Sequence, residues 1–439
     1  MTGSSHRQVV ALAGARLPAW ALPADWPRVD GRLALADLRL DAGTIASVRP
    51  AGDPPPAAWR LDGAPVLPGL VDAHTHLDKT FTAERARASR PGLLGAIEAM
   101  HRDRVGWTEP DVRARAARAL EWAHAAGAVH VRTHVDWWEP ASVPLAWSVL
   151  EHLAEEWRGR LVVERVALVP LALYADAAVA DRIATRVAET PGGVLGGFVH
   201  TVNWDAAALD HVLAATDRHG LDLDLHVDEE LNPQAQGLVT LARRVQALRL
   251  SSRVVAGHAC ALVAQDEATA LATLDAVARS GIVLVTLPVT NLLLQDATPA
   301  RTPRLRGLTL VKEARARGIP VLVASDNVQD AFCAVGSYDP VEALHAAVLV
   351  AQLDDAFDDA SQMVCRREWL VRGATSTAPF APGAKADLVA FGSTSAGAWP
   401  ARAHARVVVR DGRVVAGEVP PSWTADRAND AASPWRSAA

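Results

Sequence analysis

Cysteine and long hydrophobic runs are scarce in this chain of 439 residues. The three cysteines, Cys260, Cys333 and Cys365, form no CxxC pair, and their odd number fits a reducing compartment better than a disulfide framework. No run reaches the roughly 18 to 20 apolar residues of a membrane span, and the short apolar run at residues 9–15 lacks the basic flank of a signal peptide. We therefore expect a cytoplasmic protein with no membrane partner.

Runs of basic residues are also absent, and the formal net charge is −6, so nucleic acid is not indicated as a partner. Three common motifs are missing as well. GGVLGG (192–197) is not followed by the Lys-Ser or Lys-Thr of a P-loop, so its glycines are better explained by close packing within a strand. The chain has no HExxH, and it has no HxE with PCxxC, which excludes the zinc site of the cytidine deaminases.

What the sequence does contain is an alternation of short apolar runs with Ala-, Arg- and Glu-rich segments of helical period. There are eight such runs: VLPGLVDAH, GAVHVRTHV, LVVERVALVP, GGVLGGFVH, LDLDLHV, RVVAGHA, GIVLVTLPV and GIPVLVASD. Two of the helical segments, 111–127 and 266–281, end on a glycine, which is typical of a helix C-terminus. Eight strands separated by helices predict an α/β protein with a (β/α)8 TIM-type barrel, whose site lies at the C-terminal ends of the strands.

The two ends of the chain have a β pattern instead. Residues 38–48 and 407–417 each contain two apolar-rich runs around an Ala-Gly or Asp-Gly turn, which is a hairpin signal. We expect residues 1–65 and 376–425 to form the two parts of a small β-sandwich-like domain. Residues 66–375 would form the barrel, and residues 426–439 would be a flexible tail.

Polar side chains follow several of the apolar runs. The residues with metal-binding or catalytic chemistry are His74, His76, His226, Glu229, His258 and Asp326. Because residues i and i+2 of a strand point to the same face, His74 and His76 can bind one cation together. His226 and Asp326 would complete a site of three nitrogens and one oxygen with an open position for water, as in catalytic metal centres. Glu229 would then shuttle a proton, and His258 would hydrogen-bond the water or the oxyanion.

Each of these residues has a simpler interpretation when it is taken alone. An isolated HxH pair is more often accidental than metal-binding, a lone histidine at a strand end commonly belongs to the core, and an aspartate before Asn327 can cap a helix. Ligand-type residues at four independent strand ends, in a suitable order, favour the metal site over coincidence. For four other residues, a place in the pocket and simple burial stay equally open: His134, His200, Asn203 and Trp204.

In combination, these residues resemble the amidohydrolase superfamily, metal-dependent hydrolases with a (β/α)8 barrel and a small β domain, and especially its cytosine deaminase-like subgroup. The similar stretches are HTHLDKT (74–80), VRTHVD (131–136), LHVDE (225–229), GHA (257–259), residues 306–327 and APGAKADLVAF (381–391). The resemblance implies His74, His76, His226 and Asp326 as metal ligands, with Glu229 as the proton shuttle and His258 as the group that polarises the water or its oxyanion. It implies one divalent ion, Zn²⁺ or Fe²⁺ with Mn²⁺ as a further candidate, because the fourth run ends GGFVHTVNWD without the lysine of two-metal members.

The resemblance also implies a pocket for a small N-heterocycle. Phe332 falls where the family has an aromatic side chain near the substrate ring. Lys79 would contact a substrate oxygen, with an ion pair to Asp78 or another carboxylate as the alternative. Further substrate-binding candidates are Leu171, His200, Trp204 and Asn327.

One departure from the family concerns the end of the third run. Cytosine deaminases carry a proline there followed by a glutamine, and the amide of that glutamine hydrogen-bonds the pyrimidine edge. Here Leu171 follows Pro170, and a leucine cannot make that hydrogen bond. We therefore predict a mononuclear metal-dependent deaminase or amidohydrolase that acts on C–N bonds of a cyclic amidine or amide other than cytosine. Three alternatives stay open: opening of a cyclic amide, removal of an alkylamine or sulfur substituent, and a barrel that binds metal or ligand without catalysis. The oligomeric state stays open, with a homo-oligomer as one candidate.

Overall fold

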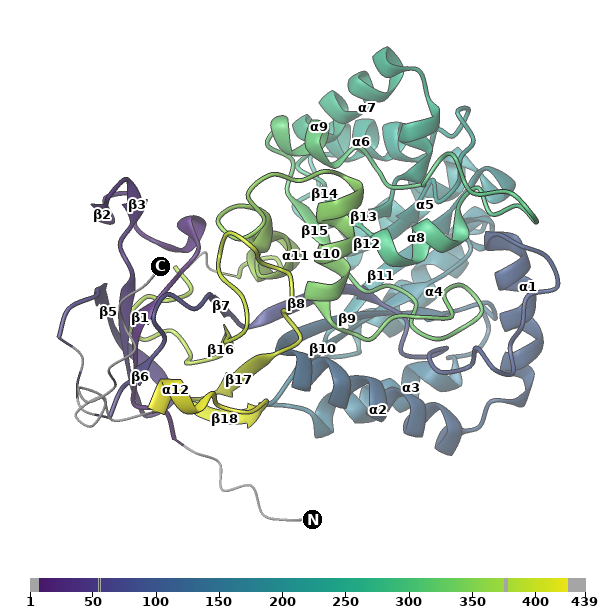
Figure 1. Ribbon diagram of the computed structural model, residues 1–439. Helices are drawn as coiled ribbons and strands as arrows, with labels where there is room; N and C mark the ends of the chain where they lie inside the picture. The colour runs from purple at the N-terminus through teal and green to yellow at the C-terminus, as the bar shows by residue number, and fades with distance from the viewer. Residues whose placement is uncertain (1–7, 54, 56, 375–377, 425–439) are drawn as a thin grey trace. The chain divides into compact units, whose positions relative to one another are not determined.

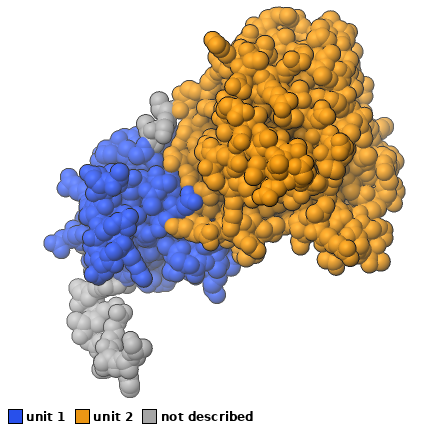
Figure 2. All heavy atoms as spheres, turned by 90° about the horizontal axis from the view of Figure 1, so that it is seen from above, with its two compact units in different colours: residues 1–68, 357–359, 377–439 blue, residues 69–356, 360–376 orange. Residues whose placement is uncertain are grey.

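The computed structural model describes residues 8–53, 55, 57–374 and 378–424, so the tail expected at 426–439 lies outside the described residues. The chain divides into two compact units, coloured separately in Figure 2. Unit 1 contains residues 1–68, 357–359 and 377–439, and unit 2 contains residues 69–356 and 360–376. Among the helices of the described residues, none combines the length and the apolar character that a bilayer span requires.

Unit 2 is built around parallel strands. Within the described residues, eight strands lie in chain order from β8 to β15, each hydrogen-bonded to the next. They are β8 (Leu70–Thr75), β9 (Ala128–Asp136), β10 (Val162–Leu168), β11 (Gly193–Val199), β12 (Leu223–Val227), β13 (Val254–His258), β14 (Val283–Thr286) and β15 (Val321–Val323). The backbone N–H of Asp326, just after β15, donates to the carbonyl of His74 in β8 at 2.9 Å, so the barrel is nearly closed. The predicted TIM-type architecture is confirmed.

Helices surround these strands, with α2 and α3 along one side of the barrel and α6, α7 and α9 along another (Figure 1). Their bounds are α1 (Leu93–Asp103), α2 (Glu109–Ala126), α3 (Leu145–Glu156), α4 (Ala177–Ala188), α5 (Ala206–His219), α6 (Gly237–Leu248), α7 (Glu267–Ser280), α8 (Pro288–Leu294), α9 (Val311–Ala316), α10 (Pro340–Val350) and α11 (Arg367–Leu370). The side chain of Thr108 caps the start of α2, and that of Asp266 caps α7. Gly127 and Gly281 follow these helices with φ of 112° and 72°, as the glycine pattern predicts.

Unit 1 combines strands from both ends of the chain in two four-stranded sheets. One has the order β5-β4-β1-β6 and the other the order β18-β17-β16-β7. The first contains β1 (Ala11–Ala15), β4 (Ala36–Asp41), β5 (Thr44–Pro50) and β6 (Trp59–Arg60). The second contains β7 (Val66–Pro68), β16 (Leu388–Phe391), β17 (Arg406–Arg410) and β18 (Arg413–Ala416). The predicted hairpins are β4–β5 and β17–β18, and side chains from both sheets share one apolar core.

The first apolar run, expected as a single strand, divides at Gly69. Its first half is β7, which pairs with β16 in unit 1, and its second half is β8, which begins the barrel of unit 2. A Cβ atom on Gly69 would lie 2.4 Å from Cγ1 of Val129, so a larger residue does not fit at this crossing.

The glycines of GGVLGG have a similar role in β11. A Cβ atom on Gly196 would lie 2.3 Å from Cγ1 of Val166 and 2.6 Å from the backbone oxygen of Asp224. We therefore expect Gly196→Ala to lower the free energy of unfolding by about 1–3 kcal/mol, the usual cost of overpacking. Urea unfolding followed by circular dichroism measures it. Gly106→Ala, at a site with no atom within 4 Å of the new carbon, is the control and should change the value by less than about 0.5 kcal/mol. Equal stability of both variants would contradict this packing argument.

Candidate metal centre and active-site pocket

Four side-chain donors meet at the C-terminal end of the barrel. His74 lies in β8, His76 directly follows it, His226 lies in β12, and Asp326 follows β15. Nε2 of His226 lies 3.2 Å from Nε2 of His74 and 3.3 Å from Nε2 of His76. Oδ1 of Asp326 lies 3.2 Å from Nε2 of His76 and 3.5 Å from Nε2 of His74. All four residues are buried.

These donor atoms fit a divalent cation. Ligand bonds of about 2.0–2.1 Å in a tetrahedral site place neighbouring ligand atoms about 3.3–3.4 Å apart, which matches the observed spacing. Burial lowers the pKa of His74, His76 and His226 well below the usual value, which favours the neutral form that binds metal. Oδ1 of Asp326 has no hydrogen-bond partner in the described part of the chain, although it is buried. A cation between the four atoms would stabilise this carboxylate.

The backbone around the centre is bent at non-glycine residues. His258 and Asp326 have φ of 70° and 62°, and Asp228 has φ of 52°. Such left-handed conformations are costly away from glycine and concentrate at functional sites. The carboxylate of Asp228 accepts the N–H groups of Gly237 at 3.0 Å and Leu238 at 2.9 Å, at the start of α6. These bonds fix the turn at Asp228, which follows β12 and directly precedes Glu229.

Glu229 and His258 lie against each other beside these four donors. Oε1 of Glu229 lies 3.3 Å from Nδ1 of His258. Helix α8 and the residue after it supply two further contacts. Nδ2 of Asn291 donates to Oε1 of Glu229 at 3.4 Å, and Nε2 of Gln295 donates to the backbone carbonyl of Glu229 at 3.2 Å. Burial, and then the charge of Asp326, raise the pKa of Glu229 well above its usual value, while burial lowers the pKa of His258 to about 4. A carboxyl group with a raised pKa can both accept and donate a proton near neutral pH.

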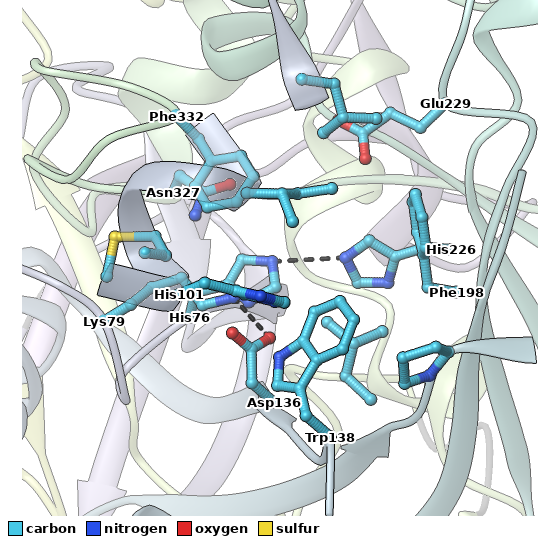
Figure 3. Close-up of a pocket in the computed structure, with 15 residues that line it drawn as sticks. His76, Lys79, His101, Asp136, Trp138, Phe198, His226, Glu229, Asn327 and Phe332 are labelled. Carbon is cyan, nitrogen blue, oxygen red and sulfur yellow. Dashed lines mark hydrogen bonds and ion pairs between the residues drawn. The ribbon is translucent and has the colours of Figure 1, made fainter. Parts of the chain in front are cut away.

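A pocket adjoins this centre (Figure 3). It is lined by His76, Lys79, Leu93, Ile97, Met100, His101, Asp136, Trp138, Leu168, Pro170, Phe198, His226, Glu229, Asn327 and Phe332. Lys79 and Asp136 form an ion pair of 2.6 Å, and the Lys79 ammonium lies 5.2 Å from the centre of the Phe332 ring. Although burial lowers it, Asp136 and Asp78 hold the pKa of Lys79 above its usual value, so this side chain is a cation. The pocket therefore combines aromatic and aliphatic walls with a few charged groups.

The structure brings some of the expected substrate-binding residues into the pocket and leaves others out. Lys79, Asn327 and Phe332 line it. Leu171, His200 and Trp204 are not among its lining residues. Leu171 is fully buried at the start of the 3-10 helix Leu171–Ala175. Nδ1 of His200 accepts the N–H of Val202 at 3.1 Å and so caps the short 3-10 helix Thr201–Asn203.

The position of Leu171 follows from the path of the chain after β10. Pro170 pairs with Phe198 of β11 in an isolated parallel β-bridge, and both residues line the pocket. The chain then turns into its 3-10 helix, which directs the next side chain into the interior. Leu168 and Pro170 therefore form the wall that the sequence pattern assigns to Leu171.

The site also contains residues to which the sequence pattern assigns no role. Asp136, Trp138, His101 and Phe198 line the pocket, and Asn291 and Gln295 contact Glu229. Asn291 and Gln295 could have been indicated by the sequence, because LPVTNLLLQD (287–296) places polar residues just after the seventh apolar run ends. His134, left open above, is fully buried, and its ring stacks on that of His74 with the centroids 3.8 Å apart.

Comparisons with known proteins agree with this geometry. Residues 154–416 match the sequence profile described as the Amidohydrolase family. The chain is 38% identical over 390 residues to the pterin deaminase of Rhizobium rhizogenes, covering 88% of this chain and 89% of the relative. It is 25% identical over 364 residues to the N-isopropylammelide isopropyl amidohydrolase of a Pseudomonas species, covering 80% and 85% of the two chains.

A solved structure has the same fold. The 5-methylcytosine deaminase of Klebsiella pneumoniae, liganded with 5-fluorocytosine, superposes with a TM-score of 0.78 at 22% identity over 93% of this chain and 98% of the other. The fold, the cluster of buried histidines with Asp326, and the sequence matches lead to one conclusion. This chain belongs to the amidohydrolase family and is a metal-dependent amidohydrolase or deaminase that acts on non-peptide C–N bonds of heterocycles.

Proposed function

We propose that the substrate is a pterin or a closely related bicyclic amino-heterocycle, and that the reaction releases ammonia. The observation that carries this proposal is the pocket that adjoins the four converging donors, because Glu229 and the flat rings of Phe198 and Phe332 line the same space. The 38% identity to a pterin deaminase over most of both chains supports the same substrate class.

The walls of the pocket suit a flat ring that carries polar atoms on its edges. Leu93, Ile97 and Met100 come from α1 and provide apolar surface, and Trp138 adds a further aromatic side chain. Aromatic rings stack on or contact the edges of such a ligand. Lys79, Asp136 and Asn327 supply a cation, an anion and an amide, which can pair with ring nitrogens and oxygens.

We further propose one divalent ion, zinc, iron or manganese, with His74, His76, His226 and Asp326 as its ligands. When bound, such an ion lowers the pKa of a coordinated water to about 7 and makes a nucleophile available at neutral pH. Glu229 accepts a proton from the attacking water and delivers it to the departing amino group. The new C–O bond replaces the C–N bond, and the amino group leaves as ammonia with that third proton. The second proton of the water moves from the oxygen to the neighbouring ring nitrogen, so that the product carries C=O. Nε2 of His258 donates a hydrogen bond to the developing oxyanion.

The metal proposal predicts about one ion per chain in purified protein. His76→Ala and Asp326→Ala should each lose both the ion and turnover, because each removes one of the four donors. His219→Ala removes a histidine that pairs instead with Asp181 at 2.9 Å, so it should retain both. Elemental analysis and ammonia release are the measurements. Wild-type turnover in protein freed of metal would exclude the proposal.

The proton-transfer proposal predicts that Glu229→Gln retains the metal and binds substrate but loses roughly 10²- to 10⁴-fold in kcat, the usual contribution of general acid–base catalysis. The neighbouring Glu230→Gln is the matched control. Oε1 of Glu230 accepts the N–H of Thr201 at 2.6 Å and its hydroxyl at 2.8 Å, and a glutamine oxygen can accept both. Its kcat should stay within about threefold of wild type. A similar kcat for both variants would assign the proton to another group.

The substrate proposal predicts release of ammonia from pterin, with formation of the 2,4-dioxo product. Cytosine should be a poor substrate, with kcat/KM below about 10⁴ M⁻¹s⁻¹, because Leu168 and Pro170 offer no amide to its polar edge. Coupled ammonia assays and mass spectrometry measure both. A product one water heavier without ammonia would indicate opening of a cyclic amide instead, and efficient turnover of cytosine would overturn the specificity argument.

A further inference from the structure

Three polar side chains form a closed triangle at the edge of the site. Nδ2 of Asn291 lies 3.4 Å from Oε1 of Glu229 and 3.3 Å from Nδ1 of His258, and the last two atoms lie 3.3 Å apart. The exposed fractions of Asn291, Glu229 and His258 are 1%, 4% and 1%, so water does not compete for these contacts. Each of the three comes from a different segment: α8, the turn after β12, and the end of β13.

We infer that Asn291 is a positioning residue, whose amide N–H groups bridge Glu229 and His258 and fix both for proton transfer. The inference rests on the proposed role of Glu229 as the proton shuttle. Asn291 is not itself a lining residue of the pocket, so it acts through the two side chains that it contacts.

The donor and acceptor types decide what this bridge does. An amide nitrogen carries two protons and accepts none, so both of its neighbours must accept. Glu229 accepts as a carboxylate. Nδ1 of His258 accepts through its lone pair, which leaves the proton of this neutral imidazole on Nε2. Nε2 has no partner among the described residues, and His258, His74 and Asp326 have ligand-type atoms within 4.8 Å of one another. Asn291 thus selects the form of His258 that presents a donor to the reaction centre.

Without the amide, a different hydrogen bond becomes available. Nδ1 of His258 could then carry the proton and donate it to Oε1 of Glu229 across the same 3.3 Å. Nε2 would become an acceptor, and one lone pair of Glu229 would be occupied by the histidine. Both changes oppose the proposed reaction, because the oxyanion loses a donor and the shuttle loses an acceptor site.

Stability alone does not explain an asparagine at this position. Oδ1 of Asn291 is buried and has no hydrogen-bond partner in the described part of the chain. An unpaired buried carbonyl destabilises the folded state, and once the amide is removed His258 and Glu229 can satisfy each other through the alternative hydrogen bond. We therefore expect Asn291→Leu to unfold at the same urea concentration as wild type or at a higher one.

The first test measures activity and stability together. Asn291→Leu and Asn291→Asp should each lower kcat by about 10²-fold, within the range of acid–base effects, with KM changed less than about threefold and the metal content unchanged. Leu293→Asp is the control, because it places a carboxylate on the exposed face of the same helix, and it should keep wild-type kcat. Wild-type kcat in both Asn291 variants would overturn the inference. A loss of activity accompanied by loss of metal or by a lower unfolding midpoint would assign Asn291 a structural role and overturn it as well.

The second test separates this inference from the proposed function. In a double-mutant cycle, Asn291→Leu should reduce kcat clearly less when Glu229 is already glutamine than in wild type, because the part of its effect that passes through Glu229 is then already lost. Nitrogen NMR of zinc-loaded protein labelled with ¹⁵N-histidine reports which ring nitrogen of His258 carries the proton, and the His258→Gln variant identifies the His258 signals. We expect the proton on Nε2 in wild type and on Nδ1 in Asn291→Leu. A proton on Nδ1 in wild type would refute the bridge. If Glu229→Gln is fully active while the NMR result holds, the proposed proton shuttle fails and the hydrogen-bond assignment stands.

Discussion

The backbone hydrogen bond from Asp326 to His74, 2.9 Å long, is the contact on which the site depends. It joins the residue that follows the last barrel strand to the first strand, and so places residues 252 positions apart beside each other. The two histidines of the HxH pair are neighbours by strand geometry alone, but Asp326 reaches them only when the barrel closes. The left-handed backbone of Asp326, with φ of 62°, turns the chain at this closure. Closure of the sheet and assembly of the donor set are therefore one structural event.

Around this centre, buried polar groups are fixed by backbone N–H groups and by amides. Asp228 binds the first N–H groups of α6, which anchors the turn that carries Glu229. Gly237 makes this possible, because a Cβ atom there would lie 2.3 Å from Oδ1 of Asp228. Gln295 holds the Glu229 backbone from the other side. Such rigid support suits the proton transfer proposed for Glu229, since small displacements are costly in catalysis.

The convergence of the four proposed metal ligands could be predicted from the sequence because their placement depends on topology alone. Once eight strands alternate with helices, His74, His76, His226 and Asp326 must lie at one end of the barrel. The role of α8 could not be predicted in this way, since the direction of Asn291 depends on how the helix packs and not on its position in the chain. Leu171 illustrates a further limit: the position after a strand is known, but the 3-10 turn that buries the side chain is not. The division of the first apolar run could not be predicted either. The run has the pattern of a single strand, but at Gly69 it splits into β7 of unit 1 and β8 of unit 2.

In the proposed function, chemistry and specificity belong to different parts of the fold. The donor set and Glu229 lie in or directly after barrel strands, whose relative positions are fixed by hydrogen bonds between neighbouring strands. Much of the substrate-facing wall comes instead from the segments between strands, with Leu93, Ile97, Met100 and His101 on α1 and Trp138 after β9. The ring of His101 packs against Trp138 with the centroids 4.2 Å apart, so these two segments support each other. Sequence changes in α1 can therefore reshape the pocket without moving any of the four converging donors. On this reasoning, relatives that share the centre should differ in substrate mainly through these segments, as the strand-to-helix loops of barrel enzymes generally allow.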